Sequence, residues 1–114
     1  MDTLEQDRQI IQKIISEYAQ IPYAYGEIER HTVFDSGSDR YLLMIVGWEG
    51  VRQVHGCIIH IEIINGKIWI HRDGTEDGIS NELLNAGIPK ERIVLGFKSP
   101  RMMKHTGFAV ALNL

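Results

Sequence analysis

The dipeptide Asn65-Gly66 constrains the fold of this chain more than any other feature. It separates two apolar-rich runs, VRQVHGCIIHIEII over residues 51–64 and KIWIHR over residues 67–72. Asn-Gly is a preferred pair for a two-residue type I′ turn, whose backbone twist matches that of two antiparallel strands. Isoleucines recur at every second position on both sides of the turn, which is the period of a strand with one buried face. These observations predict a β-hairpin.

The turn also determines which residues of the hairpin face each other. If Asn65 and Gly66 form the loop, the opposed pairs are Ile64 with Lys67, Glu62 with Trp69, Ile61 with Ile70 and His60 with His71. One face is then apolar and comprises Cys57, Ile59, Ile61, Ile63, Ile68 and Ile70. The other face carries His60, Glu62, Trp69 and His71.

The rest of the chain predicts a single α+β domain over residues 1–114. A capping box at Thr3 and Gln6 starts an N-terminal helix, which Pro22 ends at about Gln20. Alternating runs over 27–35 and 40–48 join the hairpin in an antiparallel meander of about four strands. Residues 77–87 form a short helix that stops at Gly87, and β-like segments follow at 93–97 and 106–114.

Two histidines and a carboxylate share the polar face of the predicted hairpin. Opposed Cβ atoms in a strand pair lie about 4.5–5.5 Å apart, so His60, Glu62 and His71 could together bind a transition metal. A metal-dependent enzyme is therefore one alternative function. The same residues also suit a half-exposed polar sheet face, and no third histidine or cysteine has convincing ligand spacing. We predict no resident metal or cofactor.

The stretch WIHRDGTEDGI over residues 69–79 is similar to two functional loops, and both matches are incomplete. A kinase catalytic loop needs asparagine where this chain has Gly78, and a calcium loop needs glutamate where it has Leu84. We interpret the stretch as a strand-to-helix junction in which Thr75 or Asp77 caps the helix. No catalytic residue is predicted, and the chain is expected to work by binding.

The charge distribution and the cysteine content limit the possible partners and the cellular compartment of the protein. The net charge is −3, yet residues 88–106 hold five bases against one acid, so a second alternative is DNA binding by this basic segment. Its bases are Lys90, Arg92, Lys98, Arg101 and Lys104. A single cysteine cannot form an internal disulfide, which fits a reducing cytosol. The sequence also lacks an apolar run long enough to span a membrane. We expect a cytoplasmic protein that does not contact membranes.

An ordered series of sequence blocks resembles the XisI family of fdxN element excision controlling factors from cyanobacteria. The blocks are YLLMIVGW, RQVHG, INGKIWIHRDGTEDGI, ELLNAGIPKERIVLGF and TGFAVA. They span Tyr41 to Ala111, and the N-terminal helix and IPYAYGEIE fit as well. In the family pattern, glutamine often stands near the position of His71, so the resemblance implies no required metal ligand there.

The resemblance implies a role in DNA rearrangement. Members act beside a site-specific recombinase that excises a DNA element during heterocyst development, and XisI is usually paired with XisH, a companion of nuclease-like fold. The expected function is therefore that of a non-enzymatic controlling factor that binds a XisH-like protein, as a homodimer, with DNA contacted indirectly. Aromatic, methionine and arginine side chains are enriched at interface cores, and Trp69, Arg101 and Met102 are the predicted contact residues.

Overall fold

The computed structural model describes residues 3–22 and 27–110 and confirms the α+β class. One sheet of five strands has the order β1-β2-β3-β4-β5. The strands are β1 (Glu27–Asp35), β2 (Arg40–Glu49), β3 (Arg52–Ile64), β4 (Lys67–Asp73) and β5 (Ile93–Leu95). The helices are α1 (Thr3–Ala19), α2 (Ile79–Asn85), the single 3-10 turn η1 (Lys90–Arg92) and α3 (Pro100–Met103).

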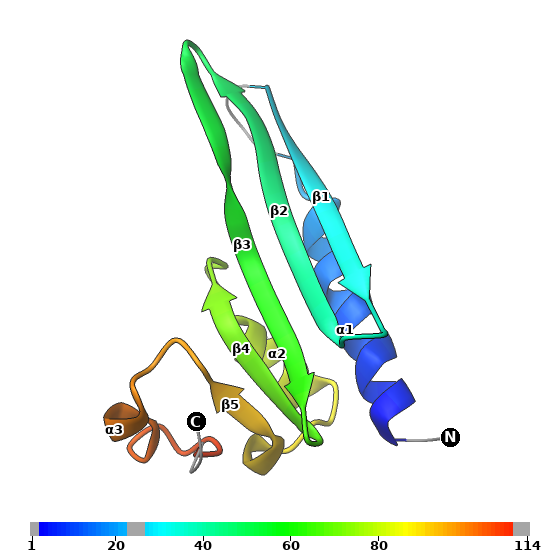
Figure 1. Cartoon of the computed structure of the whole chain (residues 1–114), viewed down its shortest axis with the longest axis vertical. Coiled ribbons are helices and arrows are strands. Elements are labelled where there is room, and N and C mark those ends of the chain that lie inside the picture. The colour runs from blue at the N-terminus through cyan, green and yellow to red at the C-terminus, as the bar shows by residue number, and fades with distance from the viewer. Residues whose placement is uncertain (1–2, 23–26, 111–114) are drawn as a thin grey trace.

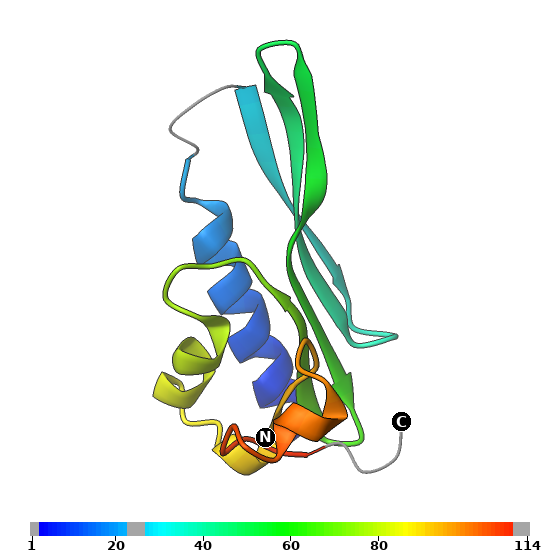
Figure 2. The same cartoon turned by 90° about the vertical axis from the view of Figure 1, so that its left-hand side faces the viewer.

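The first four strands form the predicted antiparallel meander, and β5 is added in parallel to β4. A parallel neighbour needs a crossover connection, which α2 and η1 supply. Figure 1 looks onto the sheet with α1 and α2 behind it, and Figure 2 shows both helices on the same side of the long strands. The far ends of β2 and β3 extend beyond β4 and α2 as a long hairpin (Figure 1).

The main core lies between this sheet and the two helices. Ile11, Ile14 and Ile15 form the buried stripe of α1, at the spacing of one helical face. They pack with β-strand side chains that alternate along β2, β3 and β4, and with Ile79 and Leu83 of α2. The predicted isoleucines of the hairpin face are all buried, namely Ile59, Ile61, Ile63, Ile68 and Ile70. Cys57 is only half-buried, and its thiol donates to the carbonyl of Ile59.

The hairpin register is confirmed next to the turn and wrong further out. Ile64 pairs with Lys67, Glu62 with Trp69 and Ile61 with Ile70, as Asn65-Gly66 predicts. A β-bulge then shifts the register, and His60 pairs with Arg72, not with His71. The shift leaves His71 as an extra residue on β4, and such a residue bends its strand and redirects its side chain.

The junction between β4 and α2 is held by Asp73, which corrects the predicted cap. Its two carboxylate oxygens accept hydrogen bonds from the Thr75 N–H at 3.0 Å, the Thr75 hydroxyl at 2.6 Å and the Ile79 N–H at 2.8 Å. The Thr75 hydroxyl in turn accepts from the Gly78 N–H at 3.1 Å. Asp73 therefore satisfies the first N–H of α2, a task that the sequence assigned to Thr75 or Asp77.

The end of α2 agrees with the prediction. Gly87 adopts φ +100°, and its N–H and that of Ile88 bond the Leu84 and Leu83 carbonyls, which is a Schellman motif. Over the described ranges, no helix is long and apolar enough to cross a membrane.

Candidate functional site

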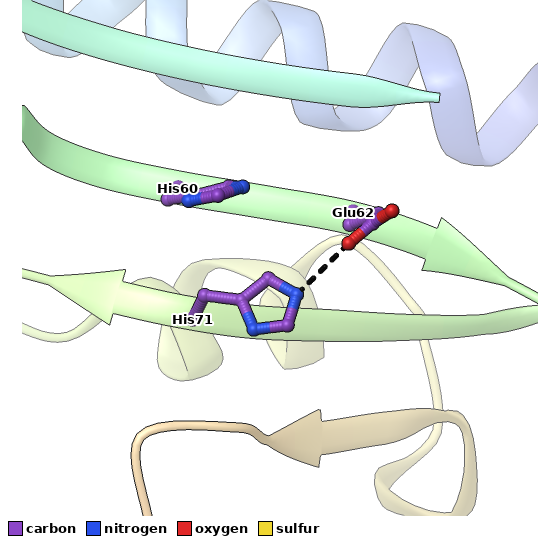
Figure 3. Close-up of side chains that lie close together, drawn as sticks. All are labelled: His60, Glu62 and His71. Atoms are coloured by element: carbon purple, nitrogen blue, oxygen red, sulfur yellow. Dashed lines mark hydrogen bonds and ion pairs between the residues drawn. The ribbon is translucent and has the colours of Figure 1, made fainter. Parts of the chain in front are cut away.

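His60, Glu62 and His71 gather on the sheet face turned away from α1. The imidazole Nε2 of His71 lies 3.0 Å from Oε1 of Glu62, and the rings of His60 and His71 are 4.9 Å apart between centroids. Figure 3 shows His60 and Glu62 on β3 and His71 on the neighbouring β4, with the contact between His71 and Glu62 dashed. The cluster forms although the predicted His60–His71 pairing is wrong, because the bulge redirects His71 toward Glu62.

Arg40, which the sequence reasoning missed, completes this cluster. Its Nε lies 3.2 Å from Oε2 of Glu62, so the carboxylate uses one oxygen for Arg40 and the other for His71. The signal that could have found it is the β2–β3 register, which places Arg40 opposite Glu62. That register depends on a second β-bulge, at Ile58, between the Met44–Cys57 and Leu43–Ile59 pairs.

The pKa values of His60 and Glu62 are both lowered, which favours the unprotonated form of each group at neutral pH. Burial lowers the pKa of His60, and the neighbouring His71 lowers it further. Burial by itself would raise the pKa of Glu62, but the hydrogen bonds from Arg40 and His71 hold it below its ordinary value. The site therefore presents an anionic carboxylate beside a neutral imidazole.

Trp69 is buried, which corrects its assignment as an exposed contact residue. Only 8% of its surface is accessible, and it packs with Val94 of β5 and Met103 of α3 in a second, smaller core. Its indole also stacks on the ring of His71 at 5.7 Å between centroids. Trp69 thus supports the cluster from the side and does not offer its ring to a partner.

Arg101 and Met102 are exposed on α3, as predicted. The prediction missed α3 itself, although Ser99-Pro100 is a typical helix start with proline at the first helical position. Within the basic segment, Arg92 pairs with the buried Asp7 and donates to the carbonyl of Gly66, so it joins α1 to the hairpin turn. Lys90, Lys98, Arg101 and Lys104 remain exposed.

A second candidate surface lies on the same side of the sheet as the cluster. Tyr41 and Leu43 of β2 point into the core, so the alternation of a strand directs Leu42, Met44, Val46 and Trp48 to the opposite side. Val33 of β1 is paired with Leu42 and joins them. We call these five residues the open face, because α1 and α2 lie on the other side of the long strands (Figures 1 and 2).

The open face is apolar and reaches the solvent. Val33 is 46% exposed, Val46 36% and Trp48 52%. His60 lies opposite Leu42 in the sheet, so the cluster adjoins the open face. Strand β2 is thus apolar on both of its sides, whereas an antiparallel strand with one solvated face ordinarily alternates with polar residues.

Comparison with known proteins places the chain in a family. The family model described as XisI protein matches residues 1–110. The chain belongs to the XisI family. Among curated proteins, none matches the chain.

Two solved XisI structures extend the match to three dimensions. A XisI-like protein from Anabaena variabilis ATCC 29413 is 31% identical, with a TM-score of 0.89 over 96% of this chain and 100% of the other. The fdxN element excision controlling factor XisI from the same organism is 38% identical, with a TM-score of 0.84 and the same coverage of both chains. The resemblance of the sequence blocks to XisI is therefore confirmed.

Proposed function

We propose that this chain is a non-enzymatic controlling factor for the site-specific excision of a DNA element, and that it acts by binding a XisH-like protein. The observation that carries the proposal is the match to the fdxN element excision controlling factor XisI, which extends over 96% of this chain at 38% identity. A match that leaves no part of the other chain uncovered supports a shared role for the whole domain, and not only a shared fold.

The open face supports action through protein contact. Val46 and Trp48 stand beside the half-buried Leu42 and Met44 on one strand, and contiguous exposed apolar patches mark interaction sites in soluble proteins. Tryptophan is enriched among residues that dominate binding energy. A partner that covered this face would give β2 the two-sided burial for which its sequence is suited.

Direct DNA binding by the basic segment is the weaker candidate. Arg92 is engaged with Asp7, which leaves four exposed bases on a chain whose net charge is −3. Phosphate contacts from these bases would give a steep fall of affinity with salt. A gel-shift salt titration of the isolated chain is expected to show no such specific, salt-sensitive complex.

We propose a non-enzymatic role because the sequence lacks the catalytic motifs of common enzyme classes. The chain has no phosphate-binding Gly-rich loop with Lys-Ser or Lys-Thr, no Gly-x-Ser-x-Gly elbow and no Glu-x-Lys pair of the nuclease type. We expect no hydrolase, kinase or nuclease activity from the isolated chain. A cleavage activity that disappears in Glu62→Gln would instead favour the metal-dependent enzyme.

The direct test is calorimetry of this chain against a XisH-like protein from the same organism. We expect a saturable heat of binding and co-elution of the two proteins on a sizing column. Absence of both at micromolar concentration, with both proteins folded by circular dichroism, would contradict the proposal. An unrelated nuclease-fold protein serves as the negative control.

A further inference from the structure

The cluster of His60, Glu62 and His71 has the chemistry of a metal centre. Imidazole nitrogens suit zinc, copper, nickel, cobalt and iron, and one carboxylate adds charge without selecting for calcium or magnesium. Their ligating atoms, one from each residue, all lie within 4.8 Å of one another. Within the described ranges, this is the one such group of three.

The distances allow one ion to reach all three side chains after small rotations. Bonds of zinc to nitrogen or oxygen are about 2.0–2.2 Å long, so two ligands at a tetrahedral angle stand roughly 3.3 Å apart. His71 and Glu62 already have this spacing, at 3.0 Å. The ring of His60, 4.9 Å from that of His71 between centroids, must approach by turning about its side-chain bonds.

Neighbouring side chains hold the ligands in place, as partners of a metal site usually do. Arg40 binds Oε2 of Glu62, which leaves Oε1 directed toward the histidines. Trp69 stacks against one side of the His71 ring. Gly96 lies so close that a Cβ there would come within 3.1 Å of Nδ1 of His71. The ring is thus restricted by Trp69 and by the backbone at Gly96.

The sequence alone led us to expect no metal, but the geometry of the three side chains changes this expectation. We propose that His60, Glu62 and His71 bind one divalent first-row transition-metal ion, of which zinc is the reference case. Oε1 of Glu62, Nε2 of His71 and one ring nitrogen of His60 are the ligands. With Nε2 of His71 bound to the ion, the ring proton would lie on Nδ1. Three protein ligands leave at least one coordination position open to water, since all three side chains are only partly buried.

His71→Gln removes the imidazole but keeps a polar side chain of similar length. Glutamine is a poorer ligand than imidazole for these ions, so this variant should lose the ion.

Cobalt titration of the untagged protein tests the proposal, because four-coordinate Co²⁺ absorbs visible light strongly while free Co²⁺ does not. The expected result is a set of absorption bands that saturates at one ion per chain and is abolished by added Zn²⁺. His71→Gln and Glu62→Gln are each expected to weaken Co²⁺ binding by at least roughly tenfold, the lower end of losses at metal sites. Circular dichroism shows whether each variant is folded. If one variant does not fold, the Co²⁺ affinity of the other still tests the proposal.

His31→Gln is the matched control, because His31 also contacts a glutamate, Glu29, at 3.1 Å and is exposed. Its Co²⁺ affinity should equal that of the unchanged protein. The proposal is overturned if no bands appear at millimolar Co²⁺ or if His31→Gln weakens binding as much as His71→Gln does. A thiolate-to-cobalt charge-transfer band would also overturn it, since that band would assign the ion to Cys57.

Discussion

Ile61 lies at the centre of the apolar face of β3, with none of its surface exposed. We predict that Ile61→Ala lowers the free energy of unfolding by about 2–5 kcal/mol, since a large-to-small core change loses buried area and leaves a cavity. Denaturant unfolding of the two proteins measures this difference. A loss below about 1 kcal/mol would show that the residue does not belong to a tightly packed core.

Val51 provides the control for this substitution. It is fully exposed at the tip of the β2–β3 hairpin, so Val51→Ala should change the free energy of unfolding by less than about 0.5 kcal/mol. Equal losses in the two variants would indicate a general effect of truncation and not the burial of Ile61.

At the scale of residues, the sequence correctly predicts the features that depend on strand alternation and on the residues of the turn. The buried isoleucines and the pairs nearest Asn65-Gly66 follow from the period and the turn. The pairing of His60 does not, because a β-bulge inserts one residue without a distinctive sequence signal. The alternation of apolar and polar residues also did not predict the burial of Trp69. Its side chain is covered by α3 and by the segment after α3, which are distant in the sequence.

Between elements, an ion pair attaches α1 to the turn between β1 and β2. Arg8 donates from Nε to Oδ1 of Asp39 at 2.7 Å and from Nη2 to Oδ2 at 3.3 Å. Asp39 adopts φ +54°, which asparagine tolerates as well as aspartate. The hydrogen bond from Arg8 holds the pKa of Asp39 below its ordinary value of 3.8.

We predict that Asp39→Asn lowers stability at pH 7 by about 1 kcal/mol, the upper end of the range for surface pairs, because the side chains of Arg8 and Asp39 are only 24% and 17% exposed. Because the folded pKa is depressed, this contribution is present above the unfolded pKa of 3.8 and is lost as the pH falls through the folded pKa. Urea unfolding at pH 7 and at about pH 2–3 measures it. A difference between the two proteins that grows as the pH falls would contradict the assignment.

Element boundaries show where the sequence was sufficient. Strand β1 has the predicted bounds, and β2, β3 and β4 differ from them by one residue at one end, because turns with Gly, Asn and Asp mark them. Helix α2 is two residues shorter at each end than predicted, since Asp73 sets its start from the preceding strand. The parallel addition of β5 depends on tertiary packing around Ile93 and Val94, which local periodicity does not contain.

For the whole molecule, the two sides of the sheet are unequal. Helices α1 and α2 cover one side of the sheet (Figures 1 and 2). Among the described residues, Met103 of α3, Ala109 and Val110 pack on the other side against Trp69 and Val94, at the β4–β5 end. The open face therefore remains as apolar surface beside the histidine–glutamate cluster. We propose that a XisH-like protein covers it.

A homodimer remains a prediction for the isolated chain, and light scattering in solution measures its mass. We expect the Trp48→Ala variant to keep the oligomeric state of the unchanged protein. If a dimer instead falls to a monomer in this variant, the open face joins two copies of the chain and is not free for a XisH-like protein.

The most direct test of the central claim compares two equally exposed apolar side chains in calorimetry against the XisH-like protein. Trp48 on the open face is 52% exposed, and Met102 on α3, a contact residue predicted from the sequence, is 51% exposed. The open face leads us to propose Trp48 as the main contact in place of Met102. We predict that Trp48→Ala weakens binding by about 2 kcal/mol, or roughly thirtyfold in Kd, while Met102→Ala changes Kd by less than about threefold. The opposite order, with Met102→Ala costly and Trp48→Ala neutral, would contradict the account and assign the contact to α3.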